Sequence, residues 1–136
     1  MDLAQAMQLA AKGMKAQGVR MRVISENLAN AETTPKGPNE APYQRRVITF
    51  KNELDRSSGL REVDVDKIQN DNSDFILKYD PNHPAADDKG YIRMPNVNSL
   101  IEMMDMREAQ RSYEANLGVI EMARSMLIRT IDLIRG

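Results

Sequence analysis

The sequence predicts a mainly α-helical chain in which long N- and C-terminal helices pair as a coiled coil, with a small β-rich insert between them. Apolar residues repeat every seven positions near both ends, which is the spacing that helices use when they wrap around other helices. The middle instead holds short alternating stretches separated by Pro, Gly and Asn. The predicted division is therefore residues 1–30, 31–97 and 98–136.

The N-terminal helix is expected over residues 2–30, with Asp2 as its cap and Asn30 near its end. Small residues, including Gly13 and Gly18, flank its apolar positions and permit close approach of a neighbouring backbone. Each glycine also costs about 1 kcal/mol of helix stability relative to alanine. Its two heptad positions are Met7, Met14, Met21 and Leu28, and Leu3, Ala10, Gln17 and Ile24.

The insert begins with a loop at residues 31–42, where three prolines and a glycine prevent regular structure. A first strand is predicted within residues 43–51, and a turn at 55–59 precedes a second strand around Val63 and Val65. A third follows where Phe75, Leu77 and Tyr79 alternate. The simplest arrangement is three short antiparallel strands, followed by a loop over residues 80–98.

The C-terminal helix is expected after Pro95, with Ser99 and Glu102 forming a capping box. At ~1.5 Å per residue it would be roughly 55 Å long, which is too long for one small globule and favours an assembly. One seam is expected to pack on the N-terminal helix and includes Leu117, Ile120 and Leu127. The opposite seam is expected to meet neighbouring subunits and includes Val119, Met122, Met126 and Leu133.

Composition excludes several classes of function. The net charge is −1, from 19 basic and 20 acidic residues, so nothing favours nucleic acid or an anionic membrane as a partner. The absence of Cys excludes disulfides and thiolate chemistry. No stretch is apolar enough to span a bilayer, and no cleavable secretory signal is recognisable. The composition is typical of a cytosolic protein unless a dedicated machine exports it.

Enzyme chemistry is weakly supported. His83, the only histidine, lies close to Asp80, Asp87 and Asp88, but neither zinc-ligand nor EF-hand spacing is present. A solvated turn is the preferred interpretation, and we predict no metal, cofactor or catalytic residue. The pair Arg45 and Arg46 is interpreted as a solubility feature of an edge strand.

The segment Asn27-Leu28-Ala29-Asn30 resembles the signature that the axial proteins of the bacterial flagellum carry near their N-terminus. The usual Thr-x-Gly-Tyr continuation is replaced by Thr33 and Thr34, with a tyrosine only at position 43. That spacing is similar to the proximal-rod subtype of this rod and hook family. Later stretches strengthen the resemblance, and their motif residues are Pro95, Asn96, Tyr113 and Asn116.

The resemblance implies a structural subunit of the proximal rod, which polymerises through its terminal helices into the drive shaft that transmits torque from rotor to hook. It implies export by the flagellar type III apparatus without a cleavable signal peptide, and a place in the rod that crosses the periplasm. The implied partners are further copies, other proximal-rod and distal-rod proteins, and the adaptor at the export gate. The alternative is a cytosolic helical-hairpin adaptor or chaperone that binds a partner helix through its Met-rich face.

Overall fold

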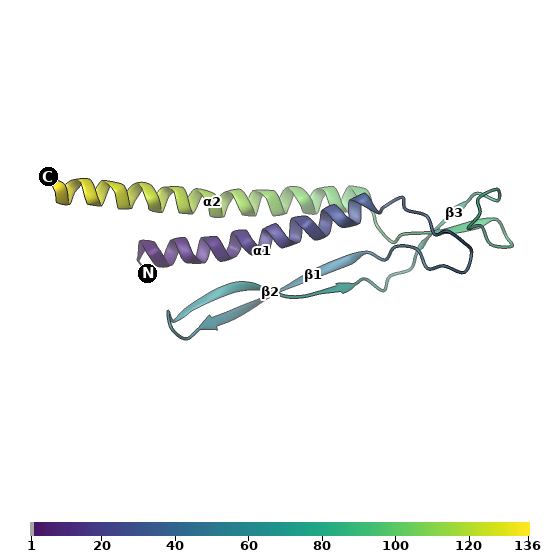
Figure 1. Ribbon diagram of the computed structural model, residues 1–136, viewed down its shortest axis with the longest axis horizontal. Helices are drawn as coiled ribbons and strands as arrows, with labels where there is room; N and C mark the ends of the chain where they lie inside the picture. Colours follow the sequence, from purple (N-terminus) through teal and green to yellow (C-terminus); the bar gives the residue numbers. More distant parts are fainter. Residues whose placement is uncertain (1) are drawn as a thin grey trace. The chain divides into compact units, whose positions relative to one another are not determined.

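The structure is a computed structural model that describes residues 2–136 (Figure 1). Along the chain, one long helix precedes the four strands and another follows them. This order confirms the predicted fold class of terminal helices with a small β insert. No helix in residues 2–136 is both long and apolar enough to cross a membrane. The elements are α1 (Leu3–Ala29), β1 (Arg46–Asp55), β2 (Leu60–Asn70), β3 (Ile76–Tyr79), β4 (Tyr91–Met94) and α2 (Ser99–Arg135).

Side-chain caps fix the first turn of both helices. Asp2 accepts the backbone N–H of Gln5 at 2.7 Å and donates its own N–H to the Gln5 side chain at 3.1 Å, so the predicted cap is confirmed. The predicted capping box of α2 is wrong. Asn98 caps that helix instead, by accepting the N–H groups of Leu100 and Ile101 at 3.1 and 3.4 Å. The Glu102 side chain points elsewhere, into a buried network described below.

The insert contains two two-stranded sheets, β1 with β2 and β3 with β4, so the prediction of one three-stranded arrangement is wrong. Residues 80–98 were expected to form a loop but contain β4, which pairs antiparallel with β3 from Tyr79 opposite Tyr91 to Ile76 opposite Met94. The predicted turn at 55–59 is confirmed, because Gly59 donates its N–H to Asp55 at 2.8 Å and has a φ of 72°.

The chain divides into two compact units, and each contains part of both helices. In the first, the N-terminal part of α1 lies alongside α2 and the β1–β2 hairpin (Figure 1). Gln8 of α1 donates to Glu62 of β2 at 2.7 Å, and Arg20 pairs with Glu108 of α2 at 3.5 Å. The described part of this unit covers residues 2–21, 49–67 and 107–136. Within it the buried apolar side chains are all alanines, namely Ala10, Ala16, Ala109 and Ala123.

The second unit has a core of larger side chains. Val23, Ile92 and Val97 are 4 % exposed or less, and Pro95 is also fully buried. Gly90 closes the β3–β4 hairpin at a φ of 85°, and an added Cβ there would lie 2.9 Å from the ring of Tyr79, so glycine is required on both counts. The segments of this unit are Arg22–Ile48 and Ile68–Met106.

The most buried side chains of α2 in the first unit are not those of the predicted seam. Leu117 and Leu127 are each 37 % exposed, Ile120 is half-buried, and Leu127 lines a hollow with Leu3 and Ala6 of α1, so the pairing of this seam with α1 stays a prediction. Ala109 and Ala123 are buried, with half-buried Asn116 midway between them at the same spacing of seven. Alanine at both buried positions has too little bulk to keep a neighbouring backbone away.

The two glycines of α1 give a matched test of that close approach. A Cβ at Gly18 would meet no atom within 4 Å, whereas one at Gly13 would lie 2.7 Å from the side-chain nitrogen of Asn116. We therefore expect Gly18→Ala to raise the free energy of unfolding by about 0.5–1 kcal/mol through helix propensity. Gly13→Ala should raise the free energy of unfolding by clearly less, because the Asn116 side chain must move to make room for the added Cβ. Chemical denaturation followed by circular dichroism measures both, and equal gains would contradict the proposed contact.

Candidate functional site

A network of polar side chains occupies the centre of the second unit, where the end of α1, the start of β1 and the start of α2 meet. Asn27 of α1 is 1 % exposed and uses its full hydrogen-bonding capacity. Its Oδ1 accepts the backbone N–H of Arg46 at 2.9 Å and the hydroxyl of Tyr43 at 2.8 Å. Its Nδ2 donates to the Arg46 carbonyl at 2.8 Å and to Glu102 at 3.4 Å. Asn27 thus binds the backbone of β1 as a neighbouring strand would.

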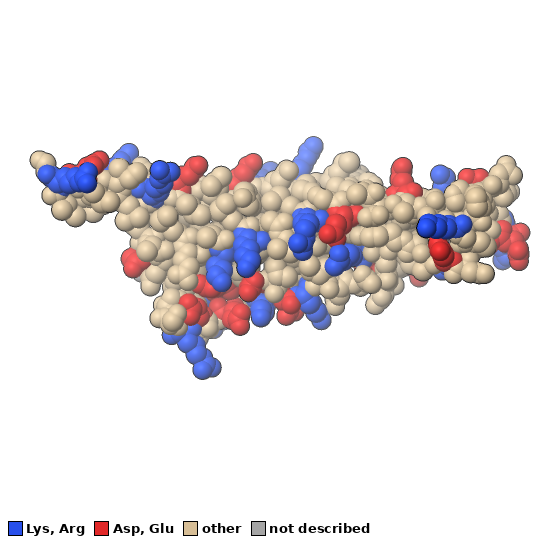
Figure 2. Space-filling model, in the orientation of Figure 1, with Lys and Arg blue, Asp and Glu red and all other residues tan. Residues whose placement is uncertain are grey.

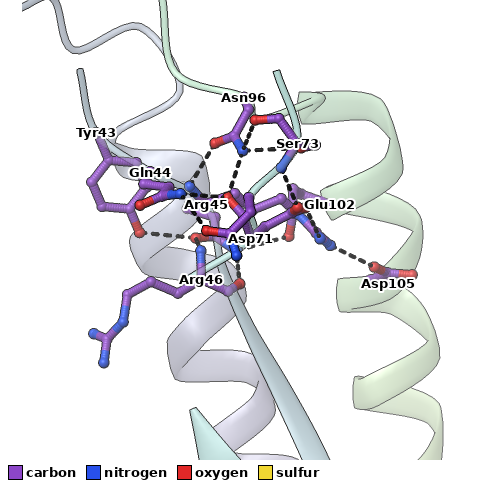
Figure 3. A network of polar contacts seen from close by, with 11 residues as sticks. Tyr43, Gln44, Arg45, Arg46, Asp71, Ser73, Asn96, Glu102 and Asp105 are labelled. Carbon is purple, nitrogen blue, oxygen red and sulfur yellow. Dashed lines mark hydrogen bonds and ion pairs between the residues drawn. The ribbon is translucent and has the colours of Figure 1, made fainter. Parts of the chain in front are cut away.

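Asn96 holds the preceding residue in a similar way. Its Oδ1 accepts the backbone N–H of Arg45 at 2.7 Å, and its Nδ2 donates to the carbonyls of Asp71 and Ser73 at 3.0 and 3.1 Å (Figure 3). The Arg45 carbonyl accepts the Asp71 N–H at 2.7 Å. Two asparagines from segments distant in the sequence therefore fix the backbone where β1 begins.

The Arg45 side chain joins this network to α2. Its Nε forms an ion pair with Glu102, whose side chain is 1 % exposed. Its Nη1 contacts Asp71 at 3.2 Å, and its Nη2 lies 3.9 Å from Asp105 (Figure 3). Arg46 pairs with Glu26 at 2.7 Å. The interpretation of Arg45 and Arg46 as exposed solubility residues is therefore wrong, because both neutralise carboxylates of this unit.

The environment raises the pKa of two members of the network. Partial burial opposes the charge of Arg45, but the hydrogen bond and charge of Glu102, with those of Asp71, outweigh it and raise the Arg45 pKa above its ordinary value. Burial, together with the charges of Glu26 and Glu102, raises the pKa of Tyr43 despite nearby Arg46. Among the described residues, no buried side-chain nitrogen or oxygen lacks a hydrogen-bond partner. The network is therefore complete within one chain.

Asp71 makes this unit sensitive to acid. The hydrogen bond from the Ser73 backbone N–H is the main cause of a lowered Asp71 pKa; burial opposes it, and the Ser73 hydroxyl and Arg45 lower the pKa further. In the unfolded chain the group titrates near its ordinary pKa of about 3.9. The stability that ionised Asp71 contributes is therefore fully present above that pH and is lost as the pH falls through the lower pKa of the folded state.

We accordingly expect the urea midpoint of the wild type to fall more steeply between about pH 5 and pH 3 than that of Asp71→Asn. Both should be followed by circular dichroism over the same pH series. The pH dependence of Asp55→Asn provides a comparison from the first unit, because hydrogen bonds from Ser57 and Ser58 lower the pKa of Asp55 as well. Identical slopes for wild type and Asp71→Asn would show that Asp71 does not contribute.

Apolar side chains exposed along α2 form a second candidate surface. Val119, Met122 and Met126 are 44, 65 and 49 % exposed, and Leu133 is 82 % exposed. These are the residues assigned by sequence to contacts with other subunits, and that role stays a prediction. On α1 the corresponding methionines, Met7, Met14 and Met21, and also Leu28, are half-buried.

Neither the His83 turn nor the surface charge indicates another site. The Nδ1 atom of His83 accepts the backbone N–H of Ala85 at 3.0 Å, which stabilises its own turn. Residues 2–136 contain no cluster of three or more side chains suited to holding a metal ion. On the face drawn in Figure 2, basic side chains are interspersed with acidic ones.

Comparison with known proteins gives matches at both ends of the chain and over its length. The model described as "Flagella basal body rod protein" matches residues 7–35, and "Flagellar basal body rod FlgEFG protein C-terminal" matches residues 88–133. The flagellar basal-body rod protein FlgC of Agrobacterium fabrum is 50 % identical over 98 % of this chain and 96 % of its own. The chain belongs to the FlgC family of flagellar basal-body rod proteins.

Other FlgC proteins match over similar lengths. That of Borreliella burgdorferi is 38 % identical over the whole of both chains, and that of Bacillus subtilis is 36 % identical over 92 % of this chain and 93 % of its own. Membership of this structural family confirms the predicted resemblance to the axial proteins of the bacterial flagellum and the prediction that the chain is not an enzyme. The alternative function, a cytosolic helical-hairpin adaptor or chaperone, receives no support from these matches.

Most residues of the FlgC-like motifs lie within helices or the second unit's core. Asn27 and Asn96 accept the backbone N–H groups of the adjacent residues Arg46 and Arg45, and Asn30 donates its side-chain N–H to the Glu26 carbonyl at 2.8 Å. Leu28 is half-buried and Ala29 ends α1. In the first unit, Tyr113 and Asn116 are half-buried on α2.

The ion pairs that join Arg45 to Asp71 and Glu102 were not predicted from the sequence. Arg45 was interpreted as a solubility residue and Glu102 as part of a capping box, and 57 positions separate the two residues. One signal was available, because Glu102 interrupts the apolar start of α2 and an acidic residue there requires either solvent or a cationic partner.

Proposed function

We propose that this rod subunit is held together by its asparagine network and assembles through the terminal helices, residues 1–30 and 98–136, which pair as a coiled coil. Residues 31–97 form the β-rich insert between these two helices. The subunit polymerises with further copies and with other proximal- and distal-rod proteins, and transmits torque from rotor to hook. It leaves the cell through the flagellar type III apparatus without a cleavable signal peptide, meets an adaptor at the export gate, and lies in the rod across the periplasm.

The exposed apolar stripe of α2 is the observation that supports assembly through the helices. The first unit buries mainly alanines, while Met122 and Met126 remain 65 and 49 % exposed. Burying one such side chain is worth about 1.5–3 kcal/mol, and a polymer repeats that gain at every subunit. In a single folded chain these side chains remain exposed to water, and contact with a neighbouring subunit would bury them.

Met126→Asp tests the proposal. We expect the variant to keep the helicity of the wild-type monomer but to be recovered in purified basal bodies at a level reduced at least about tenfold, the equivalent of ~1.4 kcal/mol. Gln110→Asp is the control, because it places the same charge at an exposed polar position of α2. Circular dichroism and immunoblots of basal bodies measure both properties. Normal incorporation of Met126→Asp would show that the stripe faces solvent in the rod.

A further inference from the structure

The final part of α2 is helical but almost uncovered. Ala123 is the last buried residue of the helix at 3 % exposure, and every residue from 124 to 136 is exposed. In the first unit, the C-terminal end of α2 extends past the start of α1 (Figure 1), and the hollow beside Leu3 of α1 reaches only to Leu127. The surface of residues 124–135 is therefore available to a partner in the free chain.

This segment is amphipathic. Successive residues of a helix are rotated by about 100°, so the apolar side chains gather on one side, here called the apolar face. Thr130 lies within that face, but its hydroxyl donates to the Met126 carbonyl at 2.9 Å and needs no water. Ile128 is the one apolar residue on the other side. The apolar face consists of Met126, Leu127, Ile131, Leu133 and Ile134.

The charged side chains are ordered around this face. Arg124 and Arg135 lie along one edge, seven positions before and four after Ile131. Arg129 lies along the other edge, and Asp132 lies opposite the middle of the face. Three arginines and one aspartate give residues 124–135 a charge of +2, although the whole chain carries −1. None of these four side chains forms an ion pair within residues 2–136.

This order of charges matches a phospholipid surface. The apolar face spans about 160° of the helix, which is wider than the seam that one partner helix requires. Arginines at both edges can keep their alkyl stems over apolar surface while their guanidinium groups reach upward to phosphate. Asp132, on the opposite side, stays in water. A helix lying in the plane of an anionic membrane places its groups in this way.

We propose that residues 124–135 of the free subunit lie on the surface of an anionic phospholipid bilayer, with the apolar face inserted at the boundary of the acyl chains. The arginines at the two edges contact the headgroup phosphates. This contact goes beyond the proposed rod function, because it is made by a subunit that has not yet been incorporated. The helix lies on the bilayer and does not cross it.

Flotation with lipid vesicles tests the contact on the purified chain. The wild type should float with vesicles of phosphatidylglycerol and phosphatidylcholine in equal parts, less so with phosphatidylcholine alone, and less at high salt. Ile134→Asp should lower binding to the anionic vesicles at least about tenfold. Ser125→Asp is the matched control, because it adds the same charge to the polar side of the same segment and should bind within about twofold of wild type. Circular dichroism in buffer should show equal helicity for all three, since both positions are exposed.

Arginine variants test the charged edges. Arg124→Gln combined with Arg129→Gln should lower binding to the anionic vesicles about tenfold, whereas Lys at both positions should keep most of it. Equal binding of the Gln variant and the wild type would overturn the role of the arginines. A wild type that does not float with anionic vesicles would overturn the proposal, and so would an Ile134→Asp variant that floats as well as wild type. If the wild type fails to float while Ile134→Asp is lost from purified basal bodies, the apolar face contacts protein and not lipid. Recovery of the wild-type chain in basal bodies tests the rod function separately.

Discussion

Asn27→Leu is expected to lower the free energy of unfolding by about 2–4 kcal/mol, because it removes the partners of several buried polar groups at once. The Arg46 N–H and carbonyl and the Tyr43 hydroxyl all lose a bond shorter than 3.0 Å to the same amide. Leucine fills a similar volume, so the loss reports on hydrogen bonding and not on a cavity. Urea denaturation of the purified monomer measures it.

Ser25→Leu provides the control for Asn27→Leu, since Ser25 is an exposed residue of the same helix. We expect it to change the midpoint by no more than about 0.5 kcal/mol. Equal effects at the two positions would mean that the buried amide contributes nothing specific, and the role assigned to the network would be lost.

Glu102→Gln is expected to cost a comparable amount, about 2–4 kcal/mol, because it leaves the Arg45 guanidinium without its buried counter-ion. Glutamine keeps the shape of the side chain, so the change removes mainly charge. Arg45 is 23 % exposed along its side chain, and water therefore compensates part of the loss. Thermal and urea unfolding should both show the decrease.

Asp105→Asn is the matched control for Glu102→Gln, because it neutralises another carboxylate facing the same guanidinium. Asp105 lies 3.9 Å from Arg45 with 34 % of its side chain exposed, and such pairs contribute about 0–1 kcal/mol. A loss for Asp105→Asn as large as that for Glu102→Gln would show that burial of the ion pair is not what matters.

Local sequence patterns were sufficient to predict the two long helices. Heptad spacing located both helices, and Asp2 marked the start of α1. β3 and β4 are both four residues long, but only β3 lies in a stretch of alternating apolar residues, whereas β4 is stabilised by pairing with β3 across an intervening loop. Alternation alone does not distinguish such a segment from a loop.

The candidate site was predicted only in part. Asn27 and Asn96 were found through family motifs, but the motifs did not indicate that Asn27 lies buried within α1 and binds the backbone of β1. The choice between Asn98 and Ser99 as the cap of α2 was also not accessible, because both residue types cap helices well. Three-dimensional proximity decided both questions.

The attachment of β1 to two side chains also makes a spectroscopic reporter. The amide protons of Arg45 and Arg46 are donated to Asn96 and Asn27 at 2.7 and 2.9 Å, and not to a neighbouring strand. Their chemical shifts and deuterium uptake therefore follow the closure of the asparagine network instead of sheet formation. In a chain caught before assembly, these two signals would reveal whether the second unit has already acquired its native arrangement, independently of the state of the helices.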